Sequence, residues 1–369
     1  MSFPHSTLSS REILAAWGLH FRPPLPMIVL ALLATRRRLL LVGLPGQAKT
    51  LLARRLGEAL GGGHFRLLNA ATSDFAEIRG YIRPRSLNRG KLEIVPGPWS
   101  VYDSRFVFID EISRAPLHAQ NRWLQLAHER LMDGLPTRIE HVLAAMNPPE
   151  VDGCFPLGIA TADRFHAAVW MDSFGSLGRE EQLRIAAGES GDDEATAGKQ
   201  LTVWVDAVCA AARAIESHPT LPRMMAGLAV AAVTAWDRTG HPFRPQGRRV
   251  VALREVLVSL LAALTVELGD PDSAANALGQ HLDAVVSIGL THIARAADHE
   301  AAGTRRAHEA AFDAVCKAWS RSAALPADES VADSTEDQTR KRALSELRHP
   351  TLSADECREL LCAWQTSAT

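Results

Sequence analysis

The sequence has 369 residues, of which 47% are hydrophobic and 22% charged, and its formal net charge is -2. This composition is typical of a soluble globular protein rather than of a disordered or membrane protein. The length predicts two domains, or two with a small C-terminal unit, and the charge gives no whole-chain reason to expect nucleic-acid binding, although a local basic patch stays open.

The N-terminal segment, residues 1–24, lacks a basic stretch followed by an apolar core, and no apolar run in the chain reaches membrane-spanning length. The five cysteines are scattered and form no CxxC pair, which favours reduced thiols over a disulfide framework or a zinc site. These features predict a cytoplasmic protein without a membrane partner.

Between residues 25 and 175, short apolar runs alternate with helical stretches. The alternation predicts the α/β class, with a parallel five-stranded sheet flanked by helices. Most of the runs are continuously apolar, as expected of strands that are covered on both faces. The predicted strands are Leu39 to Val42, Phe65 to Leu68, Phe106 to Ile109, Val142 to Met146 and Ala167 to Met171.

The first predicted strand runs into GLPGQAKTL, residues 43–51, a turn that opens a helix. Backbone N–H groups in such a turn and at a helix N-terminus can cradle phosphate oxygens. Lys49 would reach the β- and γ-phosphates, and the Thr50 hydroxyl would bind Mg²⁺. Ala48 replaces the second glycine of the usual GxxxxGK[ST] pattern, so an ordinary strand-to-helix turn is the alternative. The candidate nucleotide-binding residues here are Gly43, Pro45, Gly46, Gln47, Ala48, Lys49, Thr50 and Leu51.

The strand predicted at Phe106 to Ile109 ends in two carboxylates, Asp110 and Glu111. They lie at the C-terminal edge of the sheet, where α/β proteins bind ligands. Asp110 is a candidate to bind nucleotide and metal, and Glu111 a candidate to polarise an attacking water. A solvated strand end is the alternative interpretation.

Four motifs occur in order along this region: GLPGQAKT, FVFIDEISRAP, AAMNPPEVDGCFPL and ATADRF. Together they resemble the AAA+ ATPases of the MoxR type, over about residues 25–172. The alanine before the lysine is itself similar to the MoxR form of the loop. The resemblance implies a P-loop NTPase AAA+ core, ATP and Mg²⁺ as cofactors, and a homo-oligomeric ring, expected to be a hexamer.

The resemblance also implies roles for two further residues. Asn147 matches the polar sensor that lies beside the γ-phosphate, and an amide suits this role because it both donates and accepts hydrogen bonds. Arg164 matches the arginine finger, which acts on the nucleotide of a neighbouring subunit. The alternatives are a turn-forming asparagine before two prolines and an arginine in a surface salt bridge.

The chain after residue 175 changes to helical segments, predicted at 177–188, 200–217, 220–237, 248–268 and 273–298. We interpret residues 176–300 as an all-helical lid domain. Residues 301–369 are interpreted as a helical C-terminal extension, with a charged linker at about 326–342 and a short helix near 353–365.

Two basic segments have less specific assignments. RPQGRRVVALREV resembles the sensor-2 segment, in which Arg249, or Arg248 beside it, would face the nucleotide of its own subunit; a solvated pair is the alternative. Residues 76–100 correspond to the β-hairpin that MoxR-type proteins carry in the second helix. This insert is basic and is interpreted as solvated or as a contact for an acidic partner, a client or nucleic acid. Its basic residues are Arg79, Arg83, Arg85, Arg89 and Lys91.

The expected function is Mg²⁺-dependent ATP hydrolysis by an oligomeric ring that remodels or activates a partner protein. By resemblance, such a partner would carry a von Willebrand A domain. One alternative is a nucleotide-gated switch with slow turnover, against which Glu111 argues. A second is a motor subunit of a DNA-acting complex, since MNP segments also occur in other AAA+ proteins with the hairpin insert.

Overall fold

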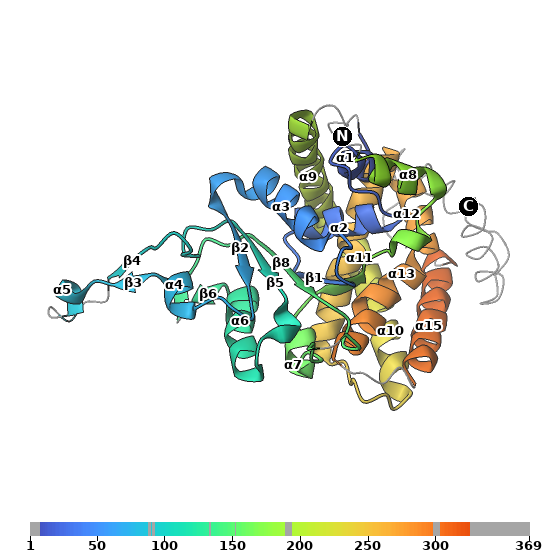
Figure 1. The fold of residues 1–369 in the computed structure, drawn as a ribbon. Helices are drawn as coiled ribbons and strands as arrows, with labels where there is room; N and C mark the ends of the chain where they lie inside the picture. The colour runs from blue at the N-terminus through green and yellow to red at the C-terminus, as the bar shows by residue number, and fades with distance from the viewer. Residues whose placement is uncertain are drawn as a thin grey trace.

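The computed structural model describes residues 8–87, 90, 93–132, 134–151, 153–188, 194–297 and 303–324. A twisted sheet with its helices forms one part of the molecule, and a bundle of long helices lies beside it (Figure 1). The linker predicted at 326–342, the helix predicted near 353–365, and two residues of the insert, Arg89 and Lys91, lie outside the described residues.

The five predicted strands form one parallel sheet in the order β2-β5-β8-β1-β9. The prediction of an α/β fold with a five-stranded parallel sheet is therefore confirmed. β1 lies between β8 and β9, with Leu39 in register with Leu143 on one side and Ala167 on the other. The strands are β1 (Leu39–Val42), β2 (Phe65–Asn69), β5 (Phe106–Asp110), β8 (His141–Met146) and β9 (Ala167–Trp170).

Helices cover both faces of the sheet, which is why its central strands are apolar except for His141 at the start of β8. Every residue of β1 and β8 is buried. On one side α3 (Lys49–Gly61) packs against β2, β5 and β8, and α2 (Leu25–Ala34) packs between β1 and the helical bundle. All ten residues of α2 are buried, so this helix belongs to the shared core of the two parts.

Further elements precede, connect or follow the strands of the sheet, and two of them form the hairpin insert. β3 (Tyr81–Ile82) pairs antiparallel with β4 (Ile94–Val95), and this insert projects away from the sheet beyond α4 (Figure 1). The other short elements are α1 (Ser10–Ala15), η1 (Gly62–His64), α4 (Phe75–Arg79), α5 (Pro84–Leu87), η2 (Ile112–Arg114), α6 (Leu117–Glu129), β6 (Leu131–Met132), β7 (Leu135–Pro136), α7 (Ile159–Ala162) and η3 (Phe174–Ser176).

The bundle is built around α11, which packs against α2, α9, α10 and α12. α15, at the end of the described chain, lies along α10 (Figure 1). None of the bundle helices, nor any other described helix, is long and apolar enough to cross a bilayer. The bundle helices are α8 (Arg179–Ala187), α9 (Glu194–Ser217), α10 (Leu221–Arg238), α11 (Gly247–Leu268), α12 (Pro271–Gln280), α13 (Leu282–Val286), α14 (His292–Ala297) and α15 (Thr304–Ala324).

One predicted helix is divided in the structure. The segment expected as a single helix over 273–298 forms α12, α13 and α14, with a π-helical turn at Ser287–Thr291. Gly289 in this turn lies against Leu253 of α11 so closely that a Cβ would stand 2.3 Å from Leu253 Cδ1. The irregular turn therefore permits a close approach of two segments, a tertiary requirement that the local sequence pattern does not express.

Three buried histidines join elements across the core. His141 Nδ1 lies 3.0 Å from the Leu33 carbonyl, and His292 Nδ1 lies 3.0 Å from the Ala168 carbonyl; since a carbonyl only accepts, both Nδ1 atoms carry the proton. His166 Nδ1 accepts from the backbone N–H of residue 38, so its Nε2 carries the proton. Burial lowers the pKa of each of the three to about 4.

Stability is expected to fall as the pH drops from 6.5 towards 4. A histidine whose pKa is near 6.5 when unfolded and about 4 when folded binds fewer protons in the native state, so its contribution is complete above pH 6.5 and is lost below it. The loss at pH 5 is about 2 kcal/mol for each histidine, which urea unfolding at pH 7 and pH 5 measures.

His292→Asn is the matched variant, because its amide can still donate to the Ala168 carbonyl while it no longer titrates. The difference between the two pH values should shrink by about 2 kcal/mol in this variant, because the contribution of His292 is removed. A difference as large as that of the unchanged chain would contradict the assignment.

Candidate nucleotide-binding site

The turn between β1 and α3 has the backbone of a phosphate-binding loop. Gly46 and Ala48 both have positive φ, 85° and 56°, and the helix begins at Lys49. A Cβ on Gly43 would lie 2.3 Å from Gln47 Oε1 and 3.0 Å from Met171 Cβ, so a larger residue would have to displace the end of the Gln47 side chain and press against Met171. Pro45 and Gly46 are exposed at the tip of the turn. Successive residues of this kind turn their N–H groups toward one point, where an anion can bind.

Ala48→Gly is expected to stabilise the protein. A left-handed backbone conformation costs an alanine about 1–2 kcal/mol, and glycine avoids this cost. Glycine loses more conformational entropy on folding, however, so only part of the energy is gained. We expect a gain of about 0.5–1 kcal/mol in the free energy of unfolding, measured by urea titration. Ala59→Gly, in the right-handed interior of the same helix, should instead cost about 1 kcal/mol. A lower free energy of unfolding in Ala48→Gly would contradict the inference that the backbone is strained at this position.

Lys49 lies beneath the turn and is 8% exposed. Its Nζ donates to the carbonyls of Gly43 at 2.6 Å and Leu44 at 2.9 Å, and to Asn147 Oδ1 at 3.2 Å. Burial lowers the pKa of the Lys49 amine, and the charge of Asp110 acts in the opposite direction. The ammonium is thus held by weak neutral acceptors, which an anionic phosphate could replace with a stronger partner.

Thr50 and Asp110 form the second contact of the site. Thr50 Oγ1 donates to Asp110 Oδ2 at 2.8 Å, which joins the first turn of α3 to the end of β5. A hydroxyl and a carboxylate are the hard oxygen donors that Mg²⁺ takes, together with phosphate oxygens and water. The pair therefore fits a magnesium ion bound with a nucleotide. No cluster of three or more His, Cys, Asp or Glu side chains with metal-binding spacing occurs elsewhere in the described ranges.

Glu111 is held in an unusual conformation beside this pair. Its φ is 53° and its ψ 38°, a left-handed geometry that costs a non-glycine residue energy and is concentrated at functional sites. Asn69 Nδ2 donates to Glu111 Oε2 at 3.0 Å, and Arg114 Nε lies 3.7 Å from Glu111 Oε1. Two cationic or donor groups thus occupy both oxygens of the carboxylate.

Asn69 is a residue that the sequence analysis missed. It ends β2, in register with Asp110 of β5, whereas the predicted strand stopped at Leu68. Its Oδ1 accepts from the backbone N–H groups of Ala71 at 2.9 Å and Thr72 at 3.3 Å, which fixes the side chain. A polar residue at the C-terminal end of a strand next to the carboxylate strand was the signal that could have identified it.

Four of the predicted residues lie close together: Lys49, Thr50, Asp110 and Asn147. Asn147, 7% exposed at the end of the central strand β8, contacts Lys49 directly. Thr50 and Asp110 lie on the same edge. Leu51 follows in the first turn of α3, with a side chain that is 43% exposed.

Arg164 lies at the opposite, N-terminal edge of the sheet, before β9 begins. Its Nη1 donates to the Ala160 carbonyl at 3.1 Å, and its own carbonyl accepts from Arg38 Nε at 2.7 Å. β1 and β9 each have four residues, so the two edges are about 13 Å apart along a strand. Within one chain, Arg164 is therefore not brought to the phosphate turn.

Arg249 corrects an expectation of the sequence analysis. It is fully buried at the start of α11, where Nη2 donates to the carbonyls of Phe165 at 2.5 Å and His166 at 3.2 Å. Its Nε lies 3.9 Å from Asp163, and Arg248 lies 3.6 Å from the same carboxylate. These partners precede β9, so α11 meets the sheet at the edge away from the phosphate turn, and neither arginine faces a nucleotide bound there.

Comparison with known proteins agrees with this geometry. Residues 38–165 match the family of AAA domains of the dynein-related subfamily. Chaperone MoxR1 of Mycobacterium tuberculosis H37Rv is 30% identical over 142 residues, 36% of either chain. Uncharacterized protein YehL of Escherichia coli K12 is 34% identical over 112 residues, 29% of this chain and 31% of that one. The chain thus matches about a third of the length of these curated relatives.

A solved protein of Cytophaga hutchinsonii, provisionally named an ATPase, has a similar fold. The two superpose with a TM-score of 0.51 over 76% of this chain and 85% of that one, at 19% identity, a likeness of fold alone. The matched AAA domain and the similarity to MoxR1, together with the phosphate turn and its carboxylate strand, support the resemblance of this part of the chain to the MoxR-type AAA+ ATPases.

Proposed function

We propose that this protein hydrolyses ATP with Mg²⁺, as an oligomeric ring, and couples hydrolysis to the remodelling or activation of a partner protein. The observation that carries the proposal is the buried Lys49 ammonium, which donates to three neutral acceptors under the turn, next to the hydrogen-bonded pair Thr50 and Asp110. Phosphoryl transfer needs positioned charge more than covalent chemistry, and these groups supply it.

Each residue has a role that its position supports. Thr50 and Asp110 would hold Mg²⁺, which neutralises phosphate charge. Glu111 would accept a proton from the attacking water once its carboxylate is released from Asn69, and Asn147 would orient that water or the γ-phosphate. Arg164 would act on the nucleotide of a neighbouring copy, which is why its place on the far edge supports a ring.

The wider assignments are proposals by similarity. A hexamer, a protein client and a partner with a von Willebrand A domain follow from the MoxR type, and one of the matched relatives is named a chaperone. We further propose a core over residues 25–175, a helical lid over 176–300 and a C-terminal extension over 301–369, in a cytoplasmic protein.

Calorimetry with ATP and GTP in the presence of Mg²⁺, followed by assays of phosphate release, tests the function on the full chain. Heat of binding with either nucleotide and release of phosphate are expected. Absence of heat with both nucleotides would overturn the proposal. Binding without release would favour a nucleotide-gated switch, for which the capture of Glu111 by Asn69 is the supporting contact.

Asn69→Asp is expected to raise basal ATP turnover. The new carboxylate keeps the acceptor for Ala71 and Thr72 but removes the donor to Glu111 and repels it. Because the net worth of such a hydrogen bond is about 1 kcal/mol, we expect turnover to rise about fivefold. The measurement is steady-state phosphate release at saturating ATP, with ATP affinity as the control. Unchanged or lower turnover at unchanged ATP affinity would contradict the proposal that Asn69 restrains Glu111.

A further inference from the structure

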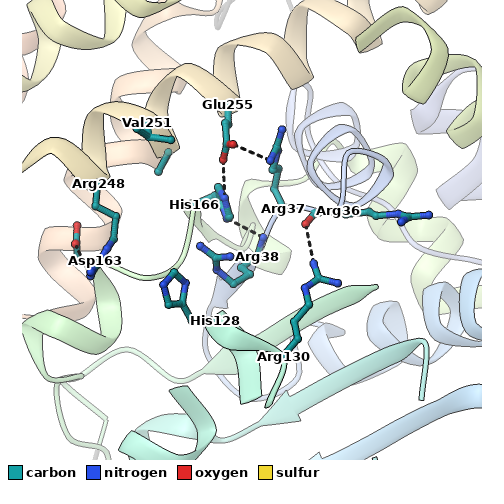
Figure 2. A pocket seen from close by; sticks show the side chains of 11 residues that line it. Arg36, Arg37, Arg38, His128, Arg130, Asp163, His166, Arg248, Val251 and Glu255 are labelled. Atoms are coloured by element: carbon teal, nitrogen blue, oxygen red, sulfur yellow. Dashed lines mark hydrogen bonds and ion pairs between the residues drawn. The ribbon is translucent and has the colours of Figure 1, made fainter. Parts of the chain in front are cut away.

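A cavity of about 310 Å³ opens at the N-terminal edge of the sheet, away from the phosphate turn (Figure 2). It is formed where the residues before β1 and β9 meet the end of α6 and the start of α11. Its charged lining consists of five arginines and two carboxylates, together with two histidines. These residues are Arg36, Arg37, Arg38, Arg130, Arg248, Asp163, Glu255, His128 and His166.

The two carboxylates are already engaged. Glu255 accepts from Arg37 at 2.9 Å and from His166 Nε2 at 2.8 Å. Asp163 lies 3.6 Å from Arg248 and 3.9 Å from the buried Arg249 behind the cavity wall. Within the described residues, the ion pairs of both carboxylates are thus formed with groups other than Arg38 and Arg130.

Arg38 and Arg130 have no carboxylate within 4 Å among the residues that the structure describes. Arg38 Nε donates to the Arg164 carbonyl at 2.7 Å, and Arg130 donates to the carbonyls of Ile139 and Arg36. In the described ranges, the hydrogen bonds of these two guanidinium groups thus go to backbone oxygens alone, and both groups face the cavity together with His128 (Figure 2).

Burial and the positive charges around the cavity lower the pKa values of Arg38 and His128, which line it. Burial, reinforced by the charge of Arg130, lowers the pKa of Arg38 to about 10. Burial, followed by the charges of Arg38, Arg164 and Arg248, lowers the pKa of His128. His128 Nδ1 is also buried without a hydrogen-bond partner in the described part of the chain. Partly buried like charges are unfavourable unless an anion lies between them.

We propose that this cavity is a second anion site, which binds a phosphoryl group through Arg38 and Arg130. Guanidinium groups present planar forks of N–H donors that match the oxygens of phosphate, and they stay charged when partly buried. The volume admits a phosphate or pyrophosphate with water. The phosphoryl group has two possible sources: a free phosphorylated anion, or the nucleotide of a second copy. The latter source rests on the proposed function, because Arg164 lies on the same edge.

Calorimetry with pyrophosphate tests the site in the full chain carrying Lys49→Ala, which weakens the phosphate turn as a competing site. Binding is expected to persist in this background and to weaken at least tenfold when Arg130→Gln or Arg38→Gln is added. Arg38→Lys, which keeps the charge without the fork, should give an intermediate loss and serves if Arg38→Gln does not fold. Arg305→Gln, an exposed arginine paired with Glu309 on α15, is the matched control and should change nothing.

Pyrophosphate affinity that is equal with and without Arg38 and Arg130 would overturn a site for a free anion. The second source is then decided by ATP-dependent assembly of the otherwise unchanged chain, measured by mass photometry. Loss of that assembly in Arg130→Gln, with ATP binding retained, would assign the site to the nucleotide of a second copy. If both pyrophosphate binding and assembly are unaffected, the proposal fails. Because the pyrophosphate measurement needs no hydrolysis, it distinguishes this failure from failure of the ATPase assignment.

Discussion

Glu111→Gln is expected to lower ATP hydrolysis by about 10²- to 10⁴-fold while ATP affinity stays within about twofold, because removing a general base affects the transition state rather than binding. Glutamine keeps the size of the side chain and can still accept from Asn69, so the fold should not change. It cannot take a proton from water at neutral pH. Phosphate release at saturating ATP gives the rate, and calorimetry gives the affinity.

A matched control for this variant is the same substitution at a glutamate outside the site. Glu58, on the exposed side of α3, is a carboxylate outside the site, and Glu58→Gln should leave the rate unchanged. Turnover in Glu111→Gln equal to that of Glu58→Gln would remove the catalytic assignment. Retained turnover with a shifted affinity would instead indicate a role for Glu111 in ground-state binding.

The α/β sheet could be predicted because its signals are local. Each strand is a short apolar run, and the motif of the phosphate turn consists of eight consecutive residues between a strand and a helix. Asp110 and Thr50, sixty positions apart, were assigned to one site because parallel strands end on the same edge, and the 2.8 Å contact between them agrees.

The assignment of Arg249 shows where such reasoning stops. It rested on the position of an arginine at a helix start, but what the side chain faces depends on how α11 docks against the sheet. That docking is set by the burial of α2 and by contacts such as Glu255 with His166, which join distant segments. A local pattern carries no information on which edge of the sheet a later helix will meet.

The basic cavity was missed for the same reason. Its lining comes from four separate stretches of chain, before β1, after α6, before β9 and in α11. In the sequence each arginine can be explained as a solvated surface residue. Only their convergence, with Arg38 and Arg130 left to backbone acceptors, indicates an anion site.

Lys49→Ala is expected to weaken ATP binding at least about 100-fold, and with it all hydrolysis. A charge-assisted hydrogen bond from a partly desolvated ammonium to phosphate is worth about 1.5–3 kcal/mol, and the Coulombic attraction to a triphosphate adds to it. Calorimetry with ATP and Mg²⁺ measures the loss. Lys199→Ala removes an exposed lysine from α9 and should leave the affinity unchanged.

The same variant separates a role in binding from a role in folding. Lys49 Nζ holds the Gly43 and Leu44 carbonyls and Asn147, so its loss leaves three acceptors without this donor; it also removes a charge whose burial is unfavourable, as the lowered pKa of the amine indicates. These effects oppose each other, so the free energy of unfolding without nucleotide should change by no more than about 1 kcal/mol. Equal ATP affinity in Lys49→Ala and Lys199→Ala would show that the Lys49 amine only stabilises the turn. The turn would then not be the phosphate-binding site.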